Sequence, residues 1–524
     1  MRLSSSAVVL VSGLAAAGVF LAAEGAPVED LVSYMPGYGD LGAAPWYSGH
    51  LHYQLGAKNI STHYVLVKSS NPADDASSTP LIFWSNGGPG ASSLYGLMTE
   101  LGPLLLNGNS LKTPEYARTG IPTLFPNADS SWSTLGDVLV FDAPAPVGFS
   151  YCDGNVGGAG TSCGDWDDGL AASNNYAALT AFYEKFPELR SRELYLTGES
   201  YAGVYIPTMA REVLQANTGR AKSEIINLKG FAVGDACAGT KVLCGGGGFG
   251  PWFDVQFMAG HGQFSSRTYS QVLSACGENK LKYVDPSDPW SPDCQSALDT
   301  MNAEIGGYYA YGLYDECEYQ NDLLLTSPAR PSHTLWRGDG NNKPALLQNK
   351  KRQLGLNDYA CGGGGALTAF TDSAAVRTAL HIPAGSKFFM ADNGEGFVYN
   401  LTEENLIPFY RDVAVGQYKD RGVRAMVYNG DTDPCINVFV AENWTQAIGL
   451  EVEESWRPWT TDGCQKMGGY VTTYDGLKFV TIRGATHMVP TSRPAAAKEL
   501  LSKWLSDEKM LSYDATCTAP HNEL

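Results

Sequence analysis

The feature that most constrains the fold of this chain is an alternation of short apolar runs with longer stretches compatible with helices. It occupies two parts of the sequence, residues 27–235 and 365–510. Strands that alternate with helices in this way predict a mainly parallel sheet with helices on both of its faces. The apolar runs are bounded by turn residues, as expected of buried strands, at 80–85, 137–141, 193–197, 228–233, 424–428 and 477–482. Helices are predicted at 168–185, 201–216 and 494–507.

The middle of the chain, from about residue 237 to 364, differs from both flanks. It contains two glycine runs and six of the eleven cysteines, namely Cys237, Cys244, Cys276, Cys294, Cys317 and Cys361. Because sheet-like sequence resumes after it, we interpret it as a disulfide-rich insertion that covers the carboxyl edge of the sheet. An independent domain is the alternative.

The amino terminus predicts export. A basic residue precedes an apolar run from Ala7 to Ala23 that ends in small residues, which is the pattern of a secretory signal peptide, and the run is marginally short for a membrane anchor. The expected organisation is a signal peptide at 1–25, a first core part at 26–236, the insertion at 237–364 and a second core part at 365–524. Eleven cysteines fit an oxidising compartment, and their odd number leaves at least one outside any disulfide within the chain.

Three glycosylation sequons, at Asn59, Asn400 and Asn443, agree with a place in the lumen of the secretory pathway. Residues 521–524 read His-Asn-Glu-Leu and resemble the HDEL retrieval signal apart from Asn522. Retention in the endoplasmic reticulum, a vacuole-like or lysosome-like compartment and the extracellular space are therefore all open. A net charge of −19 argues against nucleic acid or an anionic membrane as a partner, and no anchor is expected after signal cleavage.

Residues 198–202 have the form small-x-Ser-x-small around Ser200. The motif lies between a predicted strand and a predicted helix, which is the geometry of a nucleophile elbow. Small residues two before and two after the serine relieve crowding at such a strained turn. Without this context the pattern would be weak, because glycine and alanine are abundant.

A serine nucleophile needs a base, and the base needs a carboxylate to orient it. In α/β-hydrolase order the acid and then the histidine follow the serine. His487 comes just after the strand predicted at 477–482, where catalytic groups lie in open α/β sheets. Asp431 and Asp433 follow the strand predicted at 424–428, and from the residues alone both remain candidates for the acid.

Residues 84–93, Trp-Ser-Asn-Gly-Gly-Pro-Gly-Ala-Ser-Ser, follow another predicted strand. Successive glycines allow backbone N–H groups to point into a site, so this loop can supply one oxyanion donor while the residue after the nucleophile supplies the other. A simple Gly-Pro turn is the alternative. The loop is not a Walker motif, because no Gly-Lys-Ser/Thr follows.

Together these segments resemble the serine carboxypeptidase family. The resemblance runs from residues 47–49 through the Asn-Gly-Gly-Pro-Gly loop, residues 101–103, residues 147–151 and the elbow Gly-Glu-Ser-Tyr-Ala-Gly to residues 430–433 and 487–490. It implies an α/β-hydrolase fold with a disulfide-rich cap, and a serine-type carboxypeptidase that needs no metal or organic cofactor and acts on the C-termini of peptides and proteins.

The resemblance also implies residue roles. Ser200 would be the nucleophile, His487 the base and Asp433, rather than Asp431, the acid. The backbone N–H groups of Gly88 and Tyr201 would form the oxyanion hole. The residues expected to bind the substrate's terminal carboxylate are Asn86, Glu100 and Glu199, with Trp84 adjoining.

Two ionised glutamates would repel a carboxylate substrate, so the pair must hold protons to donate hydrogen bonds to it. Activity is therefore expected to be best at acidic pH, about 4 to 6. A solvated elbow residue is the alternative role for Glu199, and a helix-surface carboxylate is the alternative role for Glu100.

The chain departs from the family pattern at several positions, of which Ser85 and Thr486 touch no named role. Ala91 stands where the family usually has a disulfide-bonded cysteine, so that disulfide is expected to be absent. Cys435, two residues after Asp433, is the expected odd thiol near the pocket, with pairing to Cys464 or Cys517 as the alternative. Asp235 occupies a place that is usually asparagine.

Two other functions remain open. An acyltransferase of the same fold would usually lack the asparagine before Gly-Gly-Pro-Gly and carry aspartate in place of the elbow glutamate, so Asn86 and Glu199 favour the peptidase. A non-enzymatic protein on an inactivated scaffold is disfavoured, because Ser200, Asp433 and His487 are all present.

Overall fold

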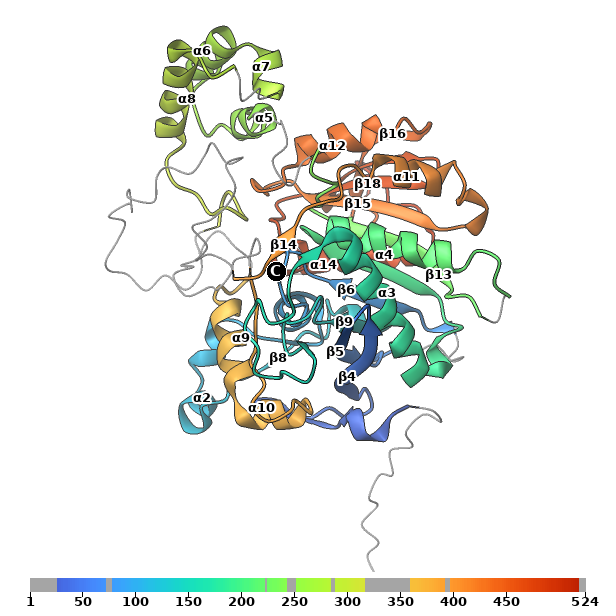
Figure 1. Cartoon of the computed structure of the whole chain (residues 1–524). Coiled ribbons are helices and arrows are strands. Elements are labelled where there is room, and N and C mark those ends of the chain that lie inside the picture. Colours follow the sequence, from blue (N-terminus) through green and yellow to red (C-terminus); the bar gives the residue numbers. More distant parts are fainter. Residues whose placement is uncertain are drawn as a thin grey trace, which may run out of the picture.

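The computed structural model describes residues 26–71, 78–221, 224–242, 251–283, 288–315, 359–391 and 396–517. The predicted signal peptide and the HDEL-like end lie outside these residues. The centre of the described chain is a twelve-stranded sheet with helices on both faces (Figure 1), which confirms the predicted architecture. Among the described residues, none of the helices combines the length and the apolar character that a bilayer crossing requires.

Six neighbouring strands in the middle of the sheet are parallel, and they are the six strands predicted from apolar runs. Helices cover both faces here, so the side chains of these strands are almost entirely buried. Their order across the sheet is β9 (Asp137–Phe141), β6 (Leu81–Ser85), β12 (Leu194–Glu199), β13 (Leu228–Gly234), β15 (Arg424–Gly430) and β18 (Leu477–Ile482).

Antiparallel strands extend the sheet on both sides. Beside β9 lie β5 (Lys58–Val67), β4 (Trp46–Leu55), β1 (Leu31–Val32) and β10 (Tyr151–Cys152), and beside β18 lie β17 (Met467–Tyr474) and β16 (Val452–Thr460). β4 and β5 contain no long apolar run, because polar side chains such as Ser48 and His63 face the interior and are hydrogen-bonded there.

Two apolar clusters, one on each face, hold the helices to the sheet. One face carries α3 (Asp168–Lys185), α4 (Ala202–Ala216), α11 (Ile407–Ala414) and α12 (Val438–Ala447). The other carries α1 (Leu94–Gly96), its π-helical continuation η3 (Leu97–Leu101), α9 (Gly363–Asp372), α10 (Ala374–Ala379), α13 (Val489–Ser492) and α14 (Pro494–Leu505). The predicted helix at 168–185 is observed with the same limits, because the side chain of Asp167 accepts a hydrogen bond from Leu170 N and caps its start.

The remaining elements are short and lie around this core. Three further two-stranded pairs are β2 (Tyr34–Met35) with β3 (Gly39–Asp40), β7 (Leu104–Leu105) with β8 (Phe125–Pro126), and β11 (Trp166–Asp167) with β14 (Tyr399–Asn400). Short helices are η1 (Val28–Asp30), η4 (Gly108–Leu111), α2 (Pro114–Thr119), η5 (Trp132–Thr134), η6 (Pro187–Leu189) and η8 (Lys419–Arg421).

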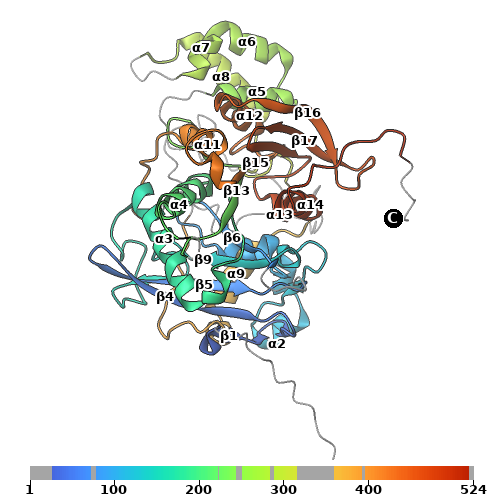
Figure 2. The same cartoon turned by 90° about the vertical axis from the view of Figure 1, so that its right-hand side faces the viewer.

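The predicted insertion forms a separate group of helices beyond one end of the sheet (Figures 1 and 2). These are α5 (Trp252–Gly260), α6 (Ser266–Cys276), α7 (Glu278–Lys282) and α8 (Pro292–Ile305), which share a small apolar core and a disulfide between Cys276 and Cys294. The group contacts α12, where Asn437 Nδ2 donates a hydrogen bond to Asp254 Oδ1 over 3.1 Å. The residue limits of the insertion stay a prediction.

Disulfides also join Cys152 to Cys163 and Cys464 to Cys517, and Cys237 and Cys361 are disulfide-bonded as well. Cys435 carries a thiol rather than a disulfide, as predicted. The alternative pairing of Cys435 with Cys464 or Cys517 is wrong, because those two cysteines bond to each other.

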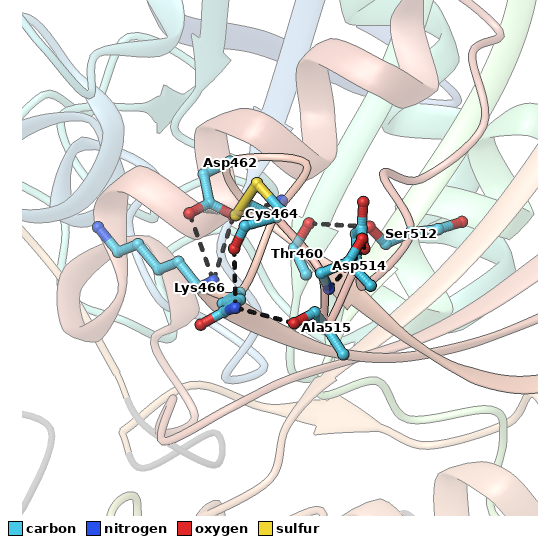
Figure 3. The surroundings of a disulfide bond; sticks show 10 residues. Thr460, Asp462, Cys464, Lys466, Ser512, Asp514 and Ala515 are labelled. Carbon is cyan, nitrogen blue, oxygen red and sulfur yellow. Dashed lines mark hydrogen bonds between the residues drawn. A yellow bond between two sulfur atoms is a disulfide. The ribbon is translucent and has the colours of Figure 1, made fainter. Parts of the chain in front are cut away.

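The Cys464–Cys517 disulfide fastens the C-terminal segment to the turn between β16 and β17 (Figure 3). Backbone hydrogen bonds accompany it, from Asp514 N to Cys464 O over 3.0 Å and from Thr460 N to Leu511 O over 2.9 Å. The last described residues, up to Cys517, therefore lie beside the antiparallel strands β16 and β17.

Candidate active site

Ser200 lies on a sharp turn between β12, which ends at Glu199, and α4, which begins at Ala202. Its φ angle is +63°, a conformation that residues with a side chain rarely adopt and that is typical of a nucleophile elbow. Ser200 N donates to Gly234 O over 2.9 Å, which fixes the turn against the end of β13. A Cβ on Gly198 would lie 2.7 Å from Ala202 Cβ, so the small residues on either side of the serine are needed for this packing.

His487 and Asp433 meet at the carboxyl ends of β18 and β15. His487 Nδ1 lies 2.7 Å from Asp433 Oδ2, and both side chains are buried. Asp433 also accepts hydrogen bonds from Cys435 N and Ile436 N, over 2.7 and 3.1 Å. Asp431 instead accepts a hydrogen bond from Gly484 N over 2.6 Å. Of the two competing aspartates, Asp433 is therefore the one hydrogen-bonded to His487.

Ser200 comes from the end of β12 and His487 from the loop after β18, and both strands end at the same edge of the sheet. Among the described residues, Ser200 Oγ forms no hydrogen bond with His487, and the Ser200 side chain is partly exposed. Hydrogen bonds of this kind are often long in unliganded sites and tighten when substrate binds.

The glycine loop after β6 lies directly against the elbow. A Cβ on Gly87 would be 2.3 Å from Tyr201 N, so only glycine permits this approach. The backbone N–H groups of Gly88 and Tyr201 donate to no acceptor within the described chain, which leaves both available to a ligand. Ala91 N donates to Gly87 O over 3.1 Å and closes the loop. This alanine stands where the family usually has a disulfide-bonded cysteine.

Asn86, Glu100 and Glu199 form one buried group beside Ser200. Asn86 Oδ1 accepts hydrogen bonds from Trp84 Nε1 over 2.9 Å and from Gly96 N over 3.0 Å. These two donors determine which way the amide points. Asn86 Nδ2 therefore faces the carboxyl groups and donates to Glu199 Oε1 over 2.9 Å and to Glu100 Oε1 over 3.2 Å.

Both glutamates favour their neutral form. Burial raises the pKa of Glu100 to about 7. Burial, followed by the charge of Glu100, raises the pKa of Glu199 well above its ordinary value. The Oε2 atoms of both residues are buried and have no hydrogen-bond partner among the described residues. Each is a position from which a protonated carboxyl can donate to a ligand.

One neighbour of the site was not predicted from the sequence. Tyr311, from the insertion, packs on His487 with ring centroids 4.8 Å apart, and its carbonyl oxygen accepts a hydrogen bond from His487 N over 2.8 Å. Leu313 N also donates to Thr432 O over 3.0 Å. The insertion therefore reaches the carboxyl edge of the sheet. A run of tyrosines is visible at 308–311, but nothing in it indicates contact with a histidine 176 positions later.

Comparisons with known proteins show the family. The family model "Serine carboxypeptidase" matches residues 36–507. The lysosomal protective protein of Mus musculus is 30% identical, with 93% of this chain and 95% of that protein covered. Serine carboxypeptidase 1 of Hordeum vulgare is 29% identical, with 93% and 94% covered.

Among solved structures, the prohormone-processing carboxypeptidase Kex1(delta)p of Saccharomyces cerevisiae superposes with a TM-score of 0.62 at 19% identity. The match covers 88% of this chain and 92% of that one, and it supports the fold. With a family model matched over most of its length, and with a relative 30% identical over nearly the whole of both chains, the protein belongs to the serine carboxypeptidase family.

Proposed function

We propose that this protein is a serine-type carboxypeptidase that releases C-terminal amino acids from peptides and proteins at acidic pH. The observation that carries the proposal is the buried group of Asn86, Glu100 and Glu199 beside Ser200. A hydrolase that cuts within a chain or acts on neutral esters has no need of a buried carboxyl pair next to its nucleophile. A hydrolase of chain ends has to recognise a carboxylate, and neutral carboxyls with a fixed amide can do so.

The proposed reaction begins when His487 takes the proton of Ser200 as Ser200 Oγ attacks the last peptide carbonyl. Asp433 holds the imidazole through Nδ1 and stabilises the imidazolium that forms. The N–H groups of Gly88 and Tyr201 accommodate the oxyanion of the tetrahedral intermediate. His487 then protonates the departing amino group, and water resolves the acyl-enzyme by the same steps.

A small cavity is the proposed place for the side chain of the terminal residue. It lies beside Thr99, the neighbour of Glu100, and beside Met488, the neighbour of His487. Its other lining residues include Tyr95, Leu106, Tyr359 and Thr491. We propose this place because part of the cavity wall comes from the two segments that also carry Glu100 and His487.

The compartment is proposed from the sequence. Signal cleavage would deliver the chain to the secretory pathway lumen, and the three sequon asparagines lie at exposed positions. One relative is named as lysosomal, and an acidic compartment of that kind suits a site that needs neutral glutamates.

The function is tested with the purified full chain and two substrates. We expect it to release free amino acids from an N-blocked dipeptide faster at about pH 5 than at about pH 7.5, as followed by mass spectrometry. Transfer of an acyl group from a sugar ester to an alcohol, without release of amino acids, would instead favour the acyltransferase. If a fluorophosphonate did not label Ser200, the result would favour the non-enzymatic alternative.

The carboxyl pair makes a specific pH prediction. Because the pKa of Glu100 is raised to about 7, wild-type KM for peptides should rise above that pH, by about tenfold per pH unit, as the neutral form disappears. In the double variant Glu100→Gln/Glu199→Gln the amides remain neutral donors, so KM should stay nearly constant. A C-terminally amidated peptide is the control substrate, since it has no carboxylate to repel. If KM of the double variant rose in parallel with the wild type, the account of neutral carboxyls would be wrong.

A further inference from the structure

Asp235 is a fully buried carboxyl that the proposed reaction does not use. It is the first residue after β13. Its Oδ1 accepts hydrogen bonds from Asn429 Nδ2 over 2.9 Å and from Gly430 N over 3.0 Å. Its Oδ2 is also buried, and no described residue donates a hydrogen bond to it. One oxygen is therefore fully used, while the other has no donor.

This carboxyl lies next to the pair formed by Asp433 and His487. One polar side-chain atom from each of Asp235, Asp433 and His487 lies within 4.8 Å of the other two. Two carboxylates this close, and both shielded from water, repel each other strongly unless one of them is protonated. Asp433 already accepts three N–H hydrogen bonds, from His487, Cys435 and Ile436, which suits an ionised carboxylate. The proton therefore belongs to Asp235.

We propose that Asp235 is a positioning residue that, as a neutral carboxylic acid, donates a hydrogen bond from Oδ2 to Asp433 and so holds Asp433 against His487. This inference rests on the proposed function of Asp433 and His487. It assigns a role to the position at which this chain carries aspartate and the family pattern has asparagine, because an asparagine amide can donate the same hydrogen bond.

The surroundings of Asp235 support a neutral side chain. Burial, followed by the charge of Asp433, raises the pKa of Asp235 well above its ordinary value, and the hydrogen bond from Gly430 N only partly opposes this. The titratable groups that face it are Glu199 at the end of β12, Tyr428 in β15, Asp433 after β15 and His487 after β18. Of these four groups, only His487 can carry a positive charge.

Losing this proton at higher pH would have two consequences. The hydrogen bond to Asp433 would disappear, and a second negative charge would stabilise the imidazolium form of His487. Both effects reduce the fraction of enzyme with a correctly held neutral base. In the Asp235→Asn variant, Oδ1 keeps its two donors and the amide Nδ2 donates at every pH, so this loss should not occur.

The test measures the second-order rate constant for labelling of Ser200 by a fluorophosphonate as a function of pH, with the full disulfide-bonded chain. The probe has no terminal carboxylate, so binding by Glu100 and Glu199 does not enter. At about pH 6 we expect Asp235→Asn to stay within about threefold of the wild type and Asp235→Ala to fall by about tenfold or more. At alkaline pH the wild-type rate should decline while the rate of Asp235→Asn stays on its plateau.

Two comparisons keep the result interpretable. Asp254→Asn removes another carboxyl, a partly buried one whose pKa is raised to about 7 by desolvation, and it should leave the wild-type profile unchanged. The inference is overturned if Asp235→Ala labels as fast as the wild type, or if Asp235→Asn keeps the wild-type alkaline decline. Wild-type protein that is not labelled at Ser200 at any pH would overturn the proposed function, and this inference with it.

Discussion

Replacing Ser200 with alanine is expected to lower kcat/KM for peptide hydrolysis by about 10⁴- to 10⁶-fold, the range seen when an activated serine nucleophile is removed. The oxygen that forms the acyl-enzyme would be missing, while the positive-φ turn that carries it is held by backbone hydrogen bonds that alanine keeps. KM should change little, because the carboxylate-binding group is untouched. The measurement is steady-state release of amino acid from a blocked dipeptide.

A second Ser-His-Asp set in the same chain provides a control variant for this experiment. Ser48, His63 and Asp142 form a second hydrogen-bonded Ser-His-Asp set, with Ser48 Oγ 3.0 Å from His63 Nε2 and His63 Nδ1 2.7 Å from Asp142 Oδ2. All three are buried, and Ser48 Oγ donates to Leu380 O over 2.8 Å. Ser48→Ala should therefore keep most of the activity and full labelling of Ser200.

The variant Ser200→Ala/His487→Ala should be no slower than either single variant, because residues that act as one unit have non-additive effects. Residual activity of Ser200→Ala near the wild-type level would exclude Ser200 as the nucleophile.

Replacing Gly87 with alanine is expected to lower kcat by about 10²- to 10³-fold, the cost of losing an oxyanion donor. The new Cβ would lie 2.3 Å from Tyr201 N and 2.9 Å from both Ala202 N and Glu199 O. All three are backbone atoms and cannot rotate away, so the loop and the elbow have to separate. The N–H groups of Gly88 and Tyr201 would then no longer face one oxygen.

Gly169→Ala is the matched control for this variant. Gly169 lies in α3, and a Cβ there would meet Asp167 Oδ1 at an ordinary 3.4 Å. It should leave kcat unchanged. The two variants are compared by kcat, by KM and by thermal unfolding, so that a folding defect is recognised. A Gly87→Ala enzyme that is folded and within about threefold of wild-type kcat would argue against this oxyanion hole.

The sequence by itself determined the centre of the fold. Strands buried on both faces are continuous apolar runs, and the six parallel strands were therefore recognisable one by one. β4 and β5 were less visible, because His63 and Ser48 are buried through hydrogen bonds that form only when distant segments meet. The position of Ser200, between a strand and a helix, was equally a local property of the chain.

The tertiary structure alone decided which distant groups meet. Local pattern does not distinguish Asp431 from Asp433, although the family resemblance pointed to Asp433. The bend after β15 directs Asp431 to Gly484 N and Asp433 to His487. Asp235 stood out in the sequence only as a departure from the family pattern, and its contacts, like those of Tyr311, form across the sheet edge. Local pattern depends on how each segment is buried. A hydrogen bond between residues more than 50 positions apart, such as that of His487 with Asp433, depends on sheet order and loop path, which no local pattern encodes.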